Sequence, residues 1–142
     1  MWAYFDSSAV VKVYVQEKGR AAVLRLLRLH EVVVSAILPV EIRGALRRRA
    51  EENTIESSRL PVALNQLAAD RAQWNLLAVS TEILWRAEQI VGRHSVRTLD
   101  AIHIASAKEF AERLQARVPF ISADQRQIEA AAAAGLTVQQ VG

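Results

Sequence analysis

The strongest constraint on the fold is an alternation of short apolar runs with longer segments of helical periodicity. Four continuous apolar runs fall at residues 2–5, 32–34, 76–79 and 118–121, and a weaker one falls at residues 137–141. Continuous apolar runs are typical of strands buried on both faces of a parallel sheet. The helical segments between them are the connections that parallel strands require. The sequence therefore predicts an α/β protein whose mainly parallel sheet of four or five strands is covered by helices on both faces.

The segments between the runs contain residues that start or stop helices. Pro39 can occupy the first turn of a helix, where its missing N–H costs nothing, and Gly92 and Gly135 each end one. The helices that we predict cover residues 9–15, 20–30, 39–53, 57–74, 81–92, 98–110 and 125–134. A chain of 142 residues with 51% hydrophobic content can bury roughly two-thirds of its unfolded surface. We therefore expect a single domain over residues 1–142.

Composition restricts the chemistry of any site. The chain has no cysteine, which removes disulfides, thiolate ligands and cysteine nucleophiles, so a metal site would need oxygen and imidazole ligands. The net charge of +3 suits a polyanionic substrate, although arginine-rich helices also simply keep a domain soluble. No apolar run approaches the roughly 20 residues of a membrane span, and no basic stretch precedes an apolar signal core. We therefore expect a cytoplasmic protein.

Four acids that are far apart in sequence occupy positions that an α/β fold would bring together. Asp6 closes the first apolar run, and Asp124 comes shortly after the fourth. Glu41 and Asp100 lie in the first turns of predicted helices. Ligands of open α/β sheets bind beyond the carboxyl ends of the strands. Carboxylates that converge there predict a site for a hard cation, Mg²⁺ or Mn²⁺.

Each of these acids also has a structural explanation when it is taken alone. An aspartate at a strand end is usually a helix cap or a turn residue, and an acid in a first helical turn interacts favourably with the helix dipole. The combination favours a site, because carboxylates clustered in a partly apolar cleft would have raised pKa values unless a cation compensated them.

Several other polar residues are weaker candidates. Ser7 and Ser122 could contact metal-bound water, but a capping role is favoured for each. His103 lies one turn after Asp100 and has no histidine partner at zinc-binding spacing, which favours a packed or hydrogen-bonded histidine over a catalytic one.

Basic residues near the acids could contact a phosphate. Lys12 follows Asp6 within the first predicted helix, and Arg43 and Arg47 follow Glu41 at helical spacings. A solvated surface position is the competing explanation for all three.

Four segments of the sequence together are typical of one protein family: YFDSSAVVK at residues 4–12, SAILPVE at 35–41, RTLDAIHIASA at 97–107 and FISAD at 120–124. They resemble PIN-domain proteins, in particular VapC-type toxins of bacterial toxin–antitoxin pairs. The resemblance covers essentially the whole chain, in order and at the usual spacing.

The resemblance implies a PIN-like three-layer α/β/α sandwich and a Mg²⁺- or Mn²⁺-dependent endoribonuclease. Asp6, Glu41, Asp100 and Asp124 match the acidic, metal-binding and catalytic site of the family. RNA phosphodiester bonds would be hydrolysed by a metal-activated water, which leaves a 5′-phosphate and a 3′-hydroxyl.

The resemblance also implies protein partners. Family members usually form homodimers, and a cognate VapB-type antitoxin holds them inactive by packing its C-terminal segment into a groove beside the acids, often with an arginine directed at them. The leucine-rich predicted helices at residues 20–30 and 57–74 could offer such an apolar groove.

Two other functions compete with a ribonuclease. A phospho-aspartyl phosphatase also begins with an aspartate at the end of its first strand, but it needs a second aspartate where this chain has Ser8. A non-catalytic PIN-fold binding module would use its acids only to receive an antitoxin arginine. Asp100→Asn separates the ribonuclease from the binding module, because in an enzyme it should abolish cleavage and largely preserve antitoxin binding.

Overall fold

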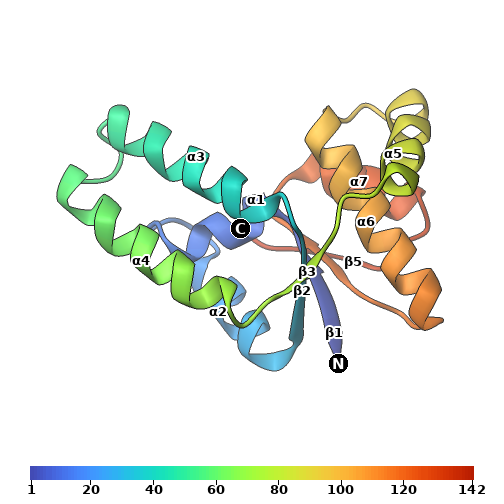
Figure 1. Cartoon of the computed structure of the whole chain (residues 1–142), viewed down its shortest axis with the longest axis horizontal. Coiled ribbons are helices and arrows are strands. Elements are labelled where there is room, and N and C mark those ends of the chain that lie inside the picture. Colours follow the sequence, from blue (N-terminus) through green and yellow to red (C-terminus); the bar gives the residue numbers. More distant parts are fainter.

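The computed structural model describes residues 1–142 and contains one sheet of five strands (Figure 1). All neighbouring strands run parallel, in the order β3-β2-β1-β4-β5. The prediction of a mainly parallel α/β sheet is confirmed. The strands are β1 (Trp2–Phe5), β2 (Glu31–Ser35), β3 (Asn75–Leu77), β4 (Phe120–Ser122) and β5 (Val138–Gln140).

Seven α-helices and two 3₁₀ turns connect the strands. None of the helices has the length and apolar character needed to cross a membrane. The α-helices are α1 (Ser7–Val10), α2 (Arg20–Leu29), α3 (Leu38–Glu51), α4 (Leu60–Arg71), α5 (Thr81–Arg93), α6 (Thr98–Leu114) and α7 (Gln125–Ala133), and the 3₁₀ turns span Val11–Val13 and Ser57–Arg59.

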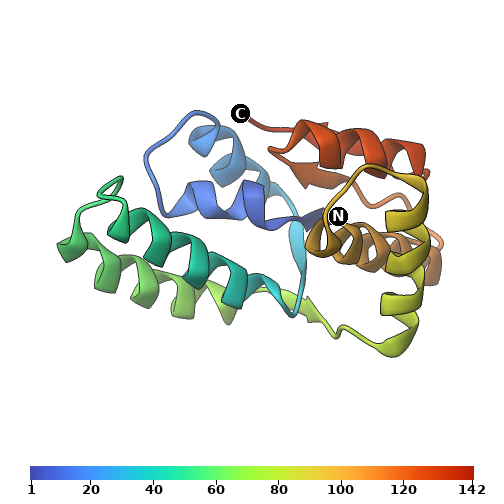
Figure 2. The same ribbon diagram turned by 90° about the horizontal axis from the view of Figure 1, so that it is seen from above.

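Side chains of β1 alternate between two hydrophobic cores, as a strand period of two requires. Ala3 and Phe5 pack in one core with residues of α1, α2, α3 and α4. Tyr4 packs in the other core with residues of α5, α6 and α7. This division gives the three-layer sandwich, from which the α3–α4 pair extends past the sheet (Figures 1 and 2).

Some element boundaries differ from the prediction for local reasons. The fourth strand begins at Phe120 rather than residue 118, because Pro119 has no N–H to donate, whereas the Phe120 N–H bonds the Thr137 carbonyl. The first helix begins at Ser7 rather than residue 9, and it tightens into the 3₁₀ turn Val11–Val13 instead of continuing as an α-helix.

The strand order reverses direction at β1. From β1 the chain builds β2 and β3 on one side, and it then crosses to add β4 and β5 on the other side. The carboxyl ends of β1 and β4 are adjacent, since the Asp6 N–H donates to the Ile121 carbonyl at 3.1 Å. Such a switch point is where open α/β sheets bind ligands, and it determines where the site must be sought.

Candidate active site

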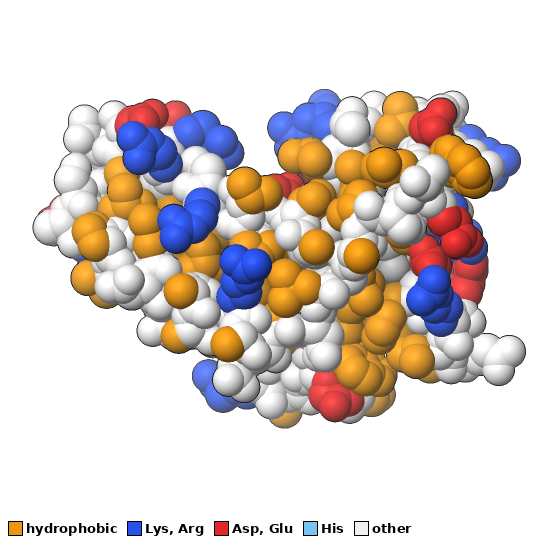
Figure 3. All heavy atoms as spheres, viewed as in Figure 1, with side chains coloured by type: hydrophobic (Ala, Val, Ile, Leu, Met, Phe, Trp, Pro, Cys, Tyr) orange, Lys and Arg blue, Asp and Glu red, His pale blue; other side chains and the backbone are white.

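All four acids line one cavity at the switch point. The cavity has a volume of about 530 Å³ and lies between the ends of β1 and β4 and the first turns of α3 and α6. Figure 3 shows a hollow between the α3 side and the α6 side of the molecule, with acidic atoms inside it and basic side chains on both rims. The four acids that line it are Asp6, Glu41, Asp100 and Asp124.

Asp6 is the buried member of the set, with 1% of its surface exposed. It caps α1 by accepting the Ala9 N–H at 3.1 Å, and it also accepts hydrogen bonds from the hydroxyls of Ser8 (2.8 Å) and Ser122 (3.0 Å). Burial raises the pKa of Asp6 to about 6, although these hydrogen bonds, and His103 when it is protonated, act to lower it. A cation in the cavity would offset the same desolvation.

Glu41 is held by two hydrogen bonds at the start of α3. Its Oε1 lies 2.6 Å from Nε2 of His103, and its Oε2 accepts from the Ser7 hydroxyl at 3.3 Å. His103 is fully buried, and its Nδ1 lies 2.7 Å from the Tyr4 hydroxyl. The sequence indicated a hydrogen-bonded histidine but not that its partner is one of the four acids.

Asp100 and Asp124 face each other across an arginine. The guanidinium of Arg97 lies 3.5 Å from Asp100 Oδ2 and 3.9 Å from Asp124 Oδ2, while 84% of the Arg97 side chain is exposed. Asp124 also caps α7 through the backbone N–H groups of Arg126 and Gln127. Arg97 was not among the sequence candidates, although its place three residues before Asp100 puts it beside that acid at the start of α6.

The lysine proposed for phosphate contact is engaged elsewhere. Lys12 is largely buried, donates to the Lys18 carbonyl at 2.7 Å and pairs with Glu17 at 3.3 Å. The 3₁₀ turn that carries Lys12 directs its ammonium to the loop that contains Glu17 and Lys18. The prediction that Lys12 could contact a phosphate is therefore wrong.

A different arginine of α3 reaches the cavity. Arg48 lines it, whereas Arg43 and Arg47 do not, and Arg47 instead pairs with Glu51. Positions 41, 44, 45 and 48 share one helix face because they recur every three to four residues. Helical periodicity alone could therefore have identified Arg48 as the basic residue on the Glu41 side.

Ser7 and Ser122 both contact acids, and Ser122 also contacts a backbone group. The Ser7 hydroxyl donates to Glu41, and the Ser122 hydroxyl donates to Asp6 and accepts the Asp124 N–H at 3.0 Å. Through these hydrogen bonds Ser7 helps to orient the Glu41 carboxylate, and Ser122 helps to orient that of Asp6.

The chemistry of the donors fits a hard divalent cation. The possible ligands in the cavity are oxygens, among them those of four carboxylates, and Mg²⁺ and Mn²⁺ prefer such ligands. No three of the acidic and histidine side chains lie close enough to form a ready ligand cluster. The desolvation of Asp6, however, and the Arg97 guanidinium between Asp100 and Asp124 both indicate a need for positive charge in this cavity.

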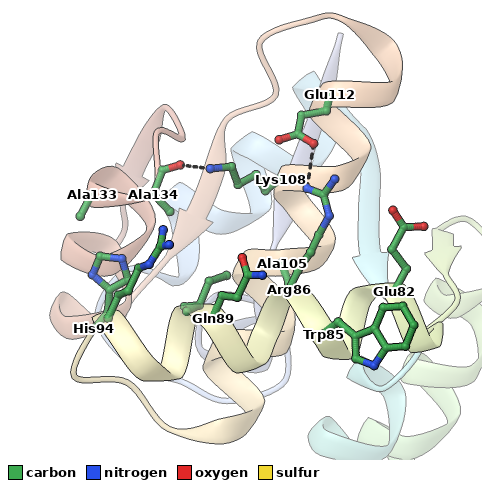
Figure 4. A pocket seen from close by; sticks show the side chains of 12 residues that line it. Glu82, Trp85, Arg86, Gln89, His94, Ala105, Lys108, Glu112, Ala133 and Ala134 are labelled. Carbon is green, nitrogen blue, oxygen red and sulfur yellow. Dashed lines mark hydrogen bonds and ion pairs between the residues drawn. The ribbon is translucent and has the colours of Figure 1, made fainter.

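Another cavity, of about 650 Å³, lies among α5, α6 and the end of α7 (Figure 4). Three of its charged side chains are engaged within it: Arg86 pairs with Glu112 at 2.7 Å, and Lys108 donates to the Ala134 carbonyl at 2.6 Å (Figure 4). It contains no aspartate, and none of the four acids lines it.

The groove predicted between the two leucine-rich helices lies at the amino ends of the strands, away from the acids. A cavity of about 670 Å³ does form between α2 and α4, where Leu24, Leu27 and Trp74 line it. It also contacts Glu31 and Val32, which begin β2, whereas the acids lie beyond the strand carboxyl ends. The expectation that these helices form a groove beside the acids is therefore wrong.

Comparison with known proteins agrees with this architecture. The family model of the PIN domain matches residues 3–133. The chain is 32% identical over 136 residues to Ribonuclease VapC46 of Mycobacterium tuberculosis, which covers 95% of this chain and 94% of that protein.

Solved structures share the fold at low sequence identity. FitAcB from Neisseria gonorrhoeae has a TM-score of 0.71 at 16% identity, covering 96% of this chain and 95% of that chain. VapC20 of Mycobacterium tuberculosis, described as a toxin that cleaves the sarcin-ricin loop, has a TM-score of 0.67 at 18% identity, covering 94% of this chain and 95% of that chain. With its sheet order, its acidic cavity and these relatives, the chain belongs to the PIN domain family, among its VapC-type members.

Proposed function

We propose that this protein is an endoribonuclease toxin that hydrolyses RNA phosphodiester bonds with the help of Mg²⁺ or Mn²⁺. The observation that carries the proposal is the meeting of four acids from separate elements in one cavity at the switch point of the sheet. The relationship to Ribonuclease VapC46 supports the reaction class.

In this proposal Asp6, Glu41, Asp100 and Asp124 hold the cation. A bound divalent cation would supply activation of a water and stabilisation of charge on the phosphate oxygens. Asp6 is occupied by donors from Ser8, Ala9 and Ser122, whereas Asp100 contacts only Arg97 through its carboxylate. We therefore assign acceptance of the proton from the attacking water to the Asp100 carboxylate.

Cleavage assays with a chelator test the proposal directly. Purified protein free of antitoxin should cut members of a panel of transfer RNA and total RNA into discrete fragments in Mn²⁺ or Mg²⁺. The fragments should vanish in EDTA and return when Mn²⁺ is added in excess, because the carboxylates alone cannot activate water efficiently. Cleavage that persists in EDTA would contradict a metal-dependent enzyme.

Arg48 and Arg97 provide positive charge on opposite sides of the acids and would contact the RNA backbone. We expect Arg48→Gln to weaken RNA binding whatever the sequence and to reduce the slope of log K against log salt by about 0.7, the value for one phosphate contact with a single strand. Fluorescence anisotropy with a labelled single-stranded RNA at several salt concentrations measures both effects.

The matched control for Arg48 is Arg25→Gln on α2, which removes the same charge from an exposed position outside the cavity. An equal loss of slope in both variants would show that Arg48 acts only through the net charge of the protein.

A non-catalytic binding module is the second candidate, and one contact favours it. Arg97 already lies against Asp100 and Asp124, so these acids accept a guanidinium without metal.

The same contact indicates how an antitoxin could bind the enzyme. An antitoxin arginine could replace Arg97 beside these two acids, and the exposed side chains of Val40 (67%) and Leu99 (47%) on the cavity wall offer apolar contacts to the antitoxin segment. We propose that a VapB-type antitoxin inhibits the enzyme in this way, and that the toxin acts as a homodimer in the cytoplasm.

A further inference from the structure

Three buried groups form a continuous chain of hydrogen bonds behind the acids. The Tyr4 hydroxyl lies 2.7 Å from Nδ1 of His103, and Nε2 of His103 lies 2.6 Å from Oε1 of Glu41. The chain joins β1, α6 and α3. Tyr4 stands two residues before Asp6, and His103 stands one turn after Asp100, so the chain links the three elements that carry three of the acids.

The direction of these hydrogen bonds follows from the groups involved. An ionised carboxylate only accepts, so Nε2 of His103 carries the hydrogen that points to Glu41. In the neutral ring Nδ1 then accepts from the Tyr4 hydroxyl. A tyrosine hydroxyl is protonated at neutral pH, so Tyr4 can supply this hydrogen.

Packing holds both rings in place. Tyr4 and His103 are fully buried. The Tyr4 ring stacks on Phe120 with centroids 5.5 Å apart and meets the His103 ring edge-on at 5.9 Å. The other donor to Glu41, Ser7, lies at a longer distance of 3.3 Å. His103 is therefore the group that determines where the Glu41 carboxylate lies.

We propose that Tyr4 and His103 are positioning residues that hold Glu41 at the cavity in the orientation needed to bind the divalent cation. This inference rests on the metal-dependent function proposed above. Groups that orient metal ligands through hydrogen bonds commonly change metal affinity by about 10- to 100-fold when they are mutated. Neither residue would touch RNA, because both are fully buried.

The test measures Mn²⁺ affinity by calorimetry or by the electron paramagnetic resonance of free Mn²⁺, without any RNA. We expect His103→Leu to weaken Mn²⁺ binding about 10-fold or more. His103→Gln should restore part of the affinity, because its amide nitrogen can replace Nε2 as the donor to Glu41. Tyr4→Phe, which keeps the ring and removes only the hydroxyl, should weaken binding in the same direction but less.

Tyr14→Phe is the matched control, since it also removes a hydrogen-bonded tyrosine hydroxyl, in this case a partly buried one that donates to Asp70 at 2.7 Å. Thermal unfolding should show a comparable loss of stability for Tyr4→Phe and Tyr14→Phe, whereas only Tyr4→Phe should lose Mn²⁺ affinity. Wild-type affinity in folded His103→Leu and Tyr4→Phe would overturn the positioning role alone. Failure of the wild-type protein to bind Mn²⁺ would overturn the metal-dependent function and, with it, this role.

Discussion

Asp100→Asn is expected to eliminate RNA cleavage while leaving the protein folded. The substitution keeps the size of the side chain and removes the charge of a residue whose carboxylate contacts only the exposed Arg97. Metal-assisted stabilisation of a transition state is worth several kcal/mol, so the rate should fall by about 10²- to 10⁴-fold. Single-turnover cleavage of a substrate RNA in saturating Mn²⁺ measures the loss.

The chain provides a matched control, because Asp70 is the one aspartate outside the site. Asp70 accepts hydrogen bonds from Tyr14 and Gln66 on the α4 side of the molecule. Asp70→Asn should cleave RNA at the wild-type rate even where it lowers the melting temperature. Binding of the antitoxin should survive in Asp100→Asn. Equal cleavage by Asp100→Asn and wild type would exclude Asp100 from the catalytic role, whereas a wild-type protein that cleaves no RNA would favour the binding module.

Topology explains why the fold and the location of the acids could be predicted from the sequence. Continuous apolar runs separated by helical patterns leave few arrangements other than a parallel sheet, and in such a sheet the residues that follow each strand meet at one edge. Asp6 follows β1 directly and Asp124 follows β4 after one residue, so their place required only the strand assignments. To predict the location of Glu41 and Asp100, it was enough to identify where the helices that carry them begin.

The contacts within the site depend on side-chain directions that no local pattern determines. Glu41 and His103 are 62 positions apart, and their hydrogen bond exists only because α3 and α6 begin on either side of the same cavity. The error for Lys12 has a local cause: a regular helix would have continued past it, but the chain tightens into a 3₁₀ turn and directs the ammonium to the Lys18 carbonyl.

The leucine-rich helices were misplaced for a related reason. Their leucine content correctly predicted a groove between them, but composition does not determine which end of the sheet the groove adjoins. Because α2 ends where β2 begins, the groove between α2 and α4 adjoins the amino end of β2. The exposed large apolar side chains beside the acids are instead those of Val40 and Leu99.

We expect the metal-free protein to become less stable as the pH rises from about 4 to about 6. The cause is Asp6, whose pKa is raised from 3.8 to about 6 by burial. Between these values the folded state binds more protons than the unfolded state, so the free energy of unfolding falls with pH and levels off above about 6. Since one pKa unit corresponds to about 1.4 kcal/mol, the ionised carboxylate lowers the free energy of unfolding by about 3 kcal/mol at neutral pH.

Asp6→Asn should remove this loss, because the amide has no charge to desolvate and its oxygen can still cap α1 through the Ala9 N–H. Urea unfolding in EDTA at pH 4 and pH 7.5 should show a large decrease for the wild type and a much smaller one for the variant. At neutral pH the metal-free variant should equal or exceed the wild type in stability.

Metal should reverse that order. A cation that binds only the folded wild type adds about 4.1 kcal/mol at about 1,000 times its dissociation constant, more than the loss of about 3 kcal/mol from the ionised Asp6 carboxylate, whereas Asp6→Asn, with one charged ligand fewer, should gain little. The variant would then be the more stable protein in EDTA and the inactive one in Mn²⁺, the exchange of stability for function that a desolvated ligand implies. If Asp6→Asn keeps the same pH dependence as the wild type, burial of Asp6 is not its source; if Mn²⁺ stabilises both equally, Asp6 is not a ligand.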